Sequence, residues 1–200
     1  ADPNFYRFDE GLKLGEAHLL DGWWQALQRN TLQRVEFDLC LVKLDTCARG
    51  LRPLRQLVIK GQNLTTEDKL QLVNRYLNRR DYDDDSGFNN ANELIDKREV
   101  PRSHWSTLFE FLRRGGDCED YASSKYFLLR LLGLKSDRLR VVVAKESMRR
   151  GHHAVLAYRW ENGSVWLLES DNVIKKTSHR GYRYIYALNE HAIWDYRPAP

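Results

Sequence analysis

A change in hydrophobic period at Gly133 sets the strongest limit on the fold. Before this glycine, apolar residues recur every three to four positions, as in amphipathic helices, whereas after it they alternate with a period of two, as in strands. Helices followed by strands with short turns predict an α+β fold, in which helices pack on an antiparallel sheet. Two helices are predicted within residues 21–49, and another begins at residues 65–68. Further helices are predicted at 106–112 and 118–132, and strands at 139–144, 152–160, 165–169 and 182–188.

The composition is that of a globular domain. The chain has 200 residues, of which 42% are hydrophobic, which is enough for one well-packed core. We expect a single compact domain in which residues 1–80 form an N-terminal helical part and residues 81–200 form the core that carries the functional site. The net charge is only +4, without a long Lys/Arg block, so a nucleic-acid partner is not indicated. No run approaches the roughly 18 apolar residues of a membrane-spanning helix.

Three cysteines are present, Cys40, Cys47 and Cys118, and an odd number is not a disulfide framework. In a continuous helix, Cys40 and Cys47 would lie about 10 Å apart, which is too far for a disulfide. They can form a bridge only if the chain bends between them. The helical pattern favours two buried thiols.

Cys118 lies in the segment GGDCEDYA, residues 115–122. Asp117 is a good helix N-cap, and Asp120 follows it with the spacing of a capping box. The first turn of a helix stabilises a thiolate through its free N–H groups, and the Cys118 N–H is placed to help bind an oxyanion. The acidic side chains of Asp117, Glu119 and Asp120 oppose a low thiol pKa. A buried structural cysteine therefore remains an alternative reading of this segment alone.

A predicted hairpin supplies a base for this thiol. If residues 161–163 (ENG) form a three-residue loop with Gly163 left-handed, Trp160 pairs with Ser164. The residue numbers of each pair then add to 324, which places His153 opposite Asp171. A loop of two or four residues would place Asn172 there instead. His152 points to the other face and is interpreted as a structural or rim histidine. We therefore expect Cys118 as nucleophile, His153 as base and Asp171 as the group that orients the base.

The local sequences resemble those of the bacterial transglutaminase-like cysteine proteinases. The similarity is carried by GGDCEDYA at 115–122, Lys125-Tyr126, HAVL at 153–156 and Asp171-Asn172, and it extends over roughly residues 82–189. It implies a papain/transglutaminase-like fold, with the nucleophile helix packed on the sheet, and a cysteine endopeptidase activity.

The resemblance also implies a biological setting. Such enzymes are similar to periplasmic endopeptidases that cut a large surface adhesin near its N-terminus, in an Ala-Ala context, and so disperse biofilm. The periplasmic domain of an inner-membrane cyclic-di-GMP receptor sequesters them. They require Ca²⁺, which implies a site at Asp117, Glu119 and Asp120; clustered carboxylate oxygens suit this ion. Capping and solvated charge are the alternative role for these acids.

Two other functions remain open from the sequence. A transglutaminase or amidase would use the same three residues on a glutamine side chain, and a catalytically idle binding module would keep the fold without the reaction. The acidic segment 81–87 (DYDDDSG) departs from the EF-hand pattern because its glycine falls one position late, and it is interpreted as a polar loop.

Overall fold

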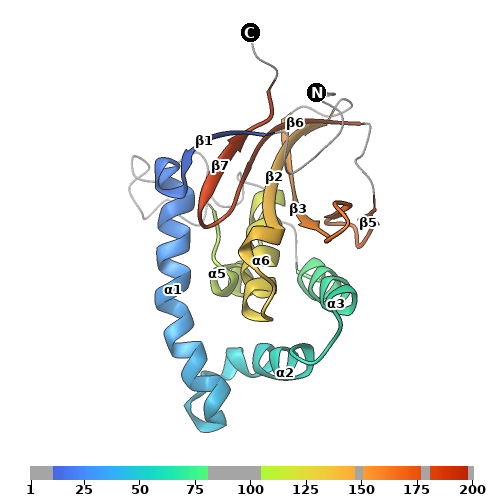
Figure 1. Cartoon of the computed structure of the whole chain (residues 1–200). Coiled ribbons are helices and arrows are strands. Elements are labelled where there is room, and N and C mark those ends of the chain that lie inside the picture. The colour runs from blue at the N-terminus through green and yellow to red at the C-terminus, as the bar shows by residue number, and fades with distance from the viewer. Residues whose placement is uncertain (1–10, 81–104, 147–150, 177–180, 198–200) are drawn as a thin grey trace.

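A computed structural model describes residues 11–80, 105–146, 151–176 and 181–197 (Figure 1). The acidic segment 81–87 lies outside these ranges. Within the described ranges, no helix is both long and apolar enough to cross a membrane.

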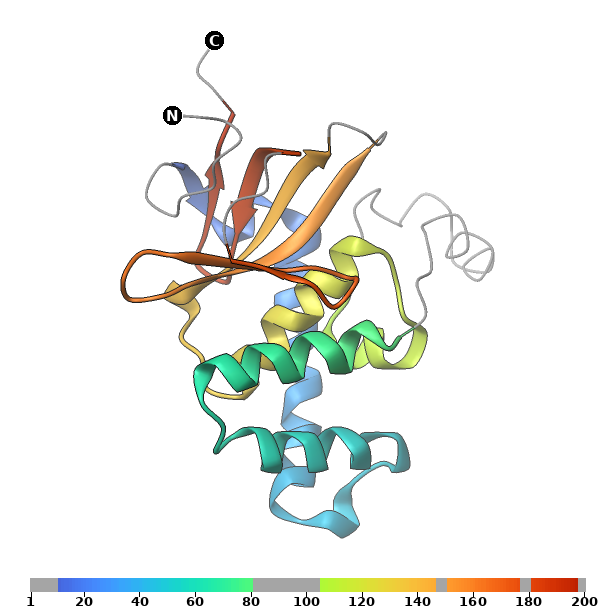
Figure 2. The same ribbon diagram turned by 90° about the vertical axis from the view of Figure 1, so that its right-hand side faces the viewer.

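A single antiparallel sheet forms one layer of the molecule, and its order is β1-β7-β6-β2-β3-β4-β5 (Figures 1 and 2). The alternating segments after Gly133 supply its centre, as the sequence predicts. Strands β1, β5 and β7 were not predicted from the sequence; β1 and β5 form the two edges of the sheet, and β7 lies between β1 and β6. The strands are β1 (Leu12–Glu16), β2 (Leu139–Glu146), β3 (His152–Arg159), β4 (Val165–Leu168), β5 (Ile174–Lys175), β6 (Tyr182–Leu188) and β7 (Ala192–Asp195).

The helices form a second layer that confirms the α+β class (Figure 2). Helix α6 packs on β2 and β3 and is itself flanked by α3 and α5, while α1 runs along the side and α2 lies beyond α3 (Figure 1). Residues 21–49 form one long helix followed by 3-10 turns, and not the two helices predicted, since no glycine or proline interrupts the chain between Gly22 and Val42. The helices are α1 (Asp21–Val42), α2 (Arg52–Gly61), α3 (Thr66–Asn78), α5 (Leu108–Arg114) and α6 (Cys118–Leu131).

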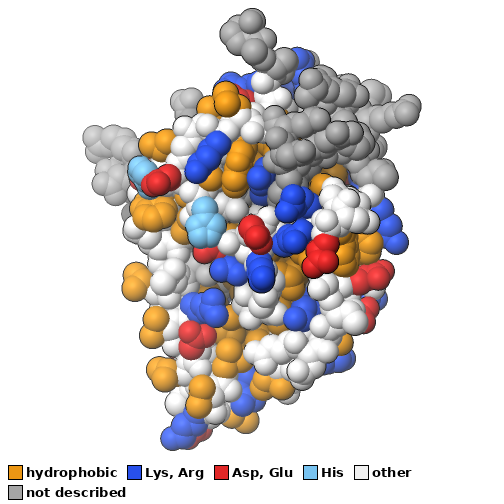
Figure 3. All heavy atoms as spheres, viewed as in Figure 1, with side chains coloured by type: hydrophobic (Ala, Val, Ile, Leu, Met, Phe, Trp, Pro, Cys, Tyr) orange, Lys and Arg blue, Asp and Glu red, His pale blue; other side chains and the backbone are white. Residues whose placement is uncertain are grey.

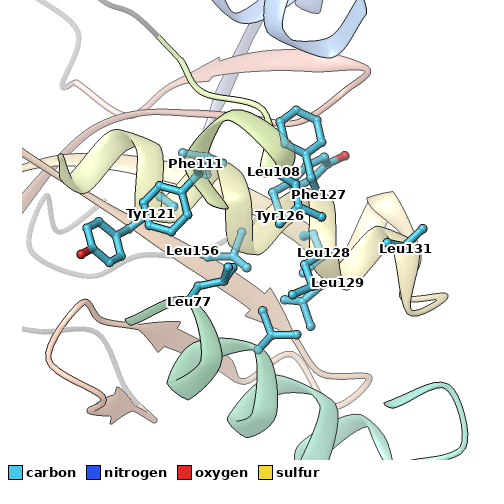
Figure 4. Close-up of a cluster of buried hydrophobic side chains, with 14 of the residues drawn as sticks. Leu77, Leu108, Phe111, Tyr121, Tyr126, Phe127, Leu128, Leu129, Leu131 and Leu156 are labelled. Atoms are coloured by element: carbon cyan, nitrogen blue, oxygen red, sulfur yellow. The ribbon is translucent and has the colours of Figure 1, made fainter. Parts of the chain in front are cut away.

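Helix α6 lies at the centre of the main hydrophobic core. Its leucines and aromatic residues meet Leu77 of α3 on one side and Leu156 of β3 on another (Figure 4). Nearly every residue of the helix after Glu119 is buried. Since a fully buried large apolar side chain stabilises the fold by about 1.5–3 kcal/mol, this packing holds the N-terminus of α6 in one place against the sheet.

Cys40 and Cys47 form a disulfide, so the expectation of two free thiols is wrong. Helix α1 ends at Val42, Lys43 is extended, and the chain turns back through a 3-10 turn. This bend brings the two Cα atoms to 4.4 Å. The prediction failed because it assumed that the helix continued past Val42.

Apolar side chains remain exposed along one stripe of α1. Leu32, Val35, Leu39 and Val42 recur at alternating intervals of three and four residues and are each at least 60% exposed. In the space-filling view, apolar groups mark the edge of the molecule where α1 runs, while Lys and Arg lie among Asp and Glu over the face shown (Figure 3).

The disulfide gives a stability prediction. Replacing Cys40 and Cys47 together by alanine should lower the free energy of unfolding by about 2 kcal/mol, because a closed loop of this size restricts the unfolded chain. Thermal unfolding with and without dithiothreitol measures the effect. Cys118→Ala keeps the disulfide, so dithiothreitol should lower its Tm as in the wild type, whereas the double variant should not respond. An equal response in all three proteins would contradict the prediction.

Candidate active site

The N-terminus of α6 is fixed by a capping box. The Asp117 carboxylate accepts a hydrogen bond from the Asp120 N–H (3.3 Å), and the Asp120 carboxylate accepts one from the Asp117 N–H (3.1 Å). The second oxygen of Asp120 accepts the Ser106 N–H at 2.9 Å, which ties the helix start to the segment before α5. Gly116 is required here, since a Cβ on it would lie 2.3 Å from the Asp120 carboxylate.

The Cys118 thiol lies against the edge of β3. Its sulfur is 3.8 Å from the carbonyl oxygen of His152, and the sulfur accepts a backbone hydrogen bond from Ala154. The paired residues of β3 and β4 begin only at Leu156, so this stretch of β3 lies beyond the end of that ladder. The thiol is thus held beside the backbone on both sides of His153.

The electrostatic surroundings of Cys118 oppose ionisation. Burial of the thiol and the nearby charges of Asp117 and Glu119 raise the pKa of Cys118 to about 12, despite backbone hydrogen bonds that act the other way. The acids therefore have the effect expected from the sequence. In these surroundings, the Cys118 thiol would be protonated at neutral pH.

His153 has a carboxylate partner, but that partner is Glu169. The Nε2 atom of His153 lies 3.0 Å from the Glu169 Oε2, and both side chains are largely buried. Asp171, predicted for this position, is instead exposed, and its carboxylate accepts the Val173 N–H in a tight turn. In the structure, the carboxylate that contacts His153 is therefore that of Glu169 and not that of Asp171.

The strand register itself was predicted correctly. Trp160 and Ser164 flank the three-residue loop, Gly163 has φ of 88°, and Leu156 pairs with Leu168, a sum of 324. The extrapolation to Asp171 failed because the ladder stops at Leu168.

Beyond that point, the Glu169 N–H bonds to the Val173 carbonyl and the chain turns, with Asn172 left-handed at φ 70°. Glu169 is two residues before Asp171, so its side chain points to the same face of the sheet that was predicted for Asp171. From there it reaches His153 as a diagonal neighbour. A lone acid at the end of the apolar run VWLL was the signal that could have identified it.

Glu169 remains ionised in this setting. Burial alone would raise its pKa, but hydrogen bonds from His153, Lys175 and Tyr182 outweigh burial and lower the pKa of Glu169 to about 2. Lys175 Nζ and the Tyr182 hydroxyl both lie 2.8 Å from Oε1. An ionised carboxylate only accepts, so Nε2 of His153 carries a proton, and in the neutral ring Nδ1 is the basic nitrogen.

The predicted calcium ligands lie together at the start of α6 but differ in how they are used. Both oxygens of Asp120 accept backbone N–H groups. Asp117 and Glu119 both act electrostatically on the Cys118 thiol, so they are the better candidates for a cation next to it. Among the described residues, no three His, Cys, Asp or Glu side chains converge on a metal position. The donor chemistry fits Ca²⁺, and further oxygen ligands are needed to complete a site.

Comparison with known proteins identifies the family. The sequence model of one protein family, the bacterial transglutaminase-like cysteine proteinases, matches residues 36–195, which is most of the chain. The chain belongs to this family. Its members are cysteine proteinases, and the fold predicted from the resemblance is confirmed. No curated protein sequence matches the chain.

Solved structures of LapG from Legionella pneumophila are similar to this chain. An EGTA-treated form has a TM-score of 0.62 and 26% identity, covering 75% of this chain and 77% of that one. A calcium-bound form has a TM-score of 0.61 and 25% identity, covering 74% and 78%. A third LapG structure has a TM-score of 0.60 and 26% identity, again covering 74% and 78%. One relative of this fold therefore binds calcium.

Because Glu169 contacts His153 and Asp171 does not, substitutions of these two acids should affect activity differently. Glu169→Gln should reduce kcat roughly 100- to 10,000-fold, because a neutral amide no longer selects the Nε2–H tautomer or stabilises the imidazolium. Asp171→Asn is the matched control and should leave kcat near the wild-type value. Peptide cleavage followed by mass spectrometry measures both. The opposite ranking would restore Asp171 as the orienting group.

Proposed function

We propose that this chain is a thiol endopeptidase in which Cys118 attacks, His153 moves the proton and Glu169 orients His153. The observation that supports this most is that the Cys118 thiol contacts the backbone on both sides of His153. The imidazole of His153 is in turn bonded to the buried, ionised carboxylate of Glu169. Family membership supports the same reaction class.

The reaction follows from these positions. Nδ1 of His153 takes the thiol proton as the sulfur attacks the peptide carbonyl, and the Cys118 N–H helps to bind the oxyanion. The tetrahedral intermediate collapses, the C–N bond breaks, and the imidazolium gives its proton to the leaving amine. Water, activated by the same imidazole, then hydrolyses the thioester and frees the thiol. Glu169 stays ionised and stabilises the imidazolium throughout.

We propose that Ca²⁺ supports this reaction at Asp117 and Glu119, with Asp120 holding the helix start beside them. When bound, the ion would supply positive charge that offsets the two carboxylates and so lowers the pKa of the Cys118 thiol. The calcium-bound LapG structure supports a calcium site in this fold.

We propose a large surface adhesin, cut near its N-terminus in an Ala-Ala context, as substrate, with biofilm dispersal as the result. The proposed location is the periplasm. The similarity to LapG supports this proposal, as does the Cys40–Cys47 disulfide, since disulfides persist in oxidising compartments such as the bacterial periplasm. The proposed regulator is the periplasmic domain of an inner-membrane cyclic-di-GMP receptor, which would sequester the enzyme.

An adhesin fragment that contains an Ala-Ala site tests the activity. The wild type with Ca²⁺ should yield two products whose masses add to that of the fragment plus water, while Cys118→Ala should yield none. A primary amine added to the reaction separates the alternatives, because a transamidase would give an amine adduct. Cleavage by Cys118→Ala would refute the nucleophile, and an intact fragment in every reaction would favour a binding module.

The same assay tests calcium. EGTA should lower the wild-type rate, and Asp117→Asn with Glu119→Gln should lower it about 10- to 100-fold, the usual cost of disturbing a metal site. Glu67→Gln is the matched control because Glu67 has the same place in the first turn of α3 that Glu119 has in α6. If EGTA and the double variant leave the rate unchanged, the calcium proposal fails.

The partner proposal predicts inhibition by mass action. Adding the receptor's isolated periplasmic domain should reduce fragment cleavage with a one-to-one stoichiometry, because a sequestered enzyme is withheld from its substrate. Size-exclusion chromatography of the mixture checks for the complex. Cleavage that is unaffected by an excess of the domain would rule out this regulator.

A further inference from the structure

Lys125 is a buried lysine in the nucleophile helix. It lies seven residues after Cys118 on α6, so the two side chains leave the helix in nearly the same direction, with Lys125 about 10 Å further along the axis. Only 1% of Lys125 is exposed. Lysine is almost never fully buried without a polar partner, so this position has to be explained by what the ammonium group contacts.

The ammonium group contacts the backbone of Glu169. Lys125 Nζ donates to the Glu169 carbonyl oxygen at 3.1 Å, and Asn78 Nδ2 from the end of α3 donates to the same oxygen at 2.8 Å. Asn78 Nδ2 also lies 3.0 Å from the Asn172 side-chain oxygen in the following turn. Two helices thus hold the peptide group of the residue whose carboxylate holds His153.

This arrangement keeps a polar group in the core at a cost. Burial lowers the pKa of Lys125 to about 7, against the attraction of Glu169 and Asp171. A leucine would fill the same place without that cost, since neighbouring positions of α6 carry Leu128 and Leu129. The lysine supplies something that leucine does not, namely a donor for the carbonyl where β4 has ended and the chain turns.

We propose that Lys125 is a positioning residue that ties the nucleophile helix to the Glu169 turn and so fixes the His153–Glu169 pair relative to Cys118. The proposal rests on the proposed joint action of Cys118 and His153. Its physical basis is that one rigid helix carries the attacking sulfur at its tip and the anchor of the orienting carboxylate two turns later. A shift of the turn would move the imidazole away from the thiol without disturbing the fold elsewhere.

Lys69 provides a matched control for the structural role of such a bond. Its Nζ donates at 2.9 Å to the Leu132 carbonyl, at the opposite end of α6 from Cys118. Both lysines therefore tie a backbone carbonyl to a helix, but only Lys125 holds the turn that carries Glu169.

The experiment compares Lys125→Met with Lys69→Met. Lys125→Met should reduce kcat for the adhesin fragment roughly 10- to 100-fold with KM unchanged, because small displacements of reacting groups cost rates of this size. The ¹⁵N signals of the His153 ring, assigned by their loss in His153→Gln, should shift as the Nε2–H bond to Glu169 weakens. Lys69→Met should leave both kcat and the His153 signals as in the wild type.

The outcomes separate this proposal from the proposed function. If the wild type does not cleave the fragment, the proposed function fails, and the His153 spectrum still decides the role of Lys125. If Lys125→Met does not fold, Asn78→Ser removes the other donor to the same carbonyl and should shift the spectrum and lower kcat in the same direction, by less. Wild-type kcat and spectrum in the folded variants, or equal changes in Lys69→Met, would overturn the proposal.

Discussion

Because α6 is almost fully buried, several of its polar side chains form hydrogen bonds with other segments of the protein. Asp120 takes the Ser106 N–H, Ser123 donates to the Ser106 carbonyl, and Lys125 donates to the Glu169 carbonyl. Buried polar groups that lacked such bonds would cost more than the bonds contribute when formed. The partners lie in two separate segments, so these hydrogen bonds join both the segment before α5 and the turn after β4 to the same helix.

The candidate site depends on these joins because its three groups come from three separate elements. Cys118 starts a helix, His153 lies near the start of a strand, and Glu169 follows the end of another. None is close to another in sequence, and only the packing of α6 on β3 brings the first two together. Burial and the nearby acids raise the pKa of Cys118, whereas Glu169 is kept charged by three donors. The Cys118 thiol and the Glu169 carboxylate thus lie in opposite electrostatic surroundings.

Most of the fold and part of the site could be predicted from the sequence. The change in period, the capping residues and the loop at Gly163 are local signals, and they gave the fold class, the start of α6 and the register of β3 with β4. The disulfide and the acid beside His153 depend on where a regular element stops, at Val42 and at Leu168. The exact end of a helix or strand is decided by tertiary contacts, so extrapolating a regular pattern past it gave Asp171 in place of Glu169.

The pairing of β1 with β7 has a consequence for how the chain folds. Residues 12–16 make their sheet contacts with residues 192–195, so this edge of the sheet joins segments near opposite ends of the described chain. Chains are synthesised at about 5–20 residues per second, so many seconds pass between the synthesis of β1 and that of its partner strand β7. The sheet can be completed only after synthesis of β7, which makes its closure a late and slow event, as expected for contacts of such long sequence separation.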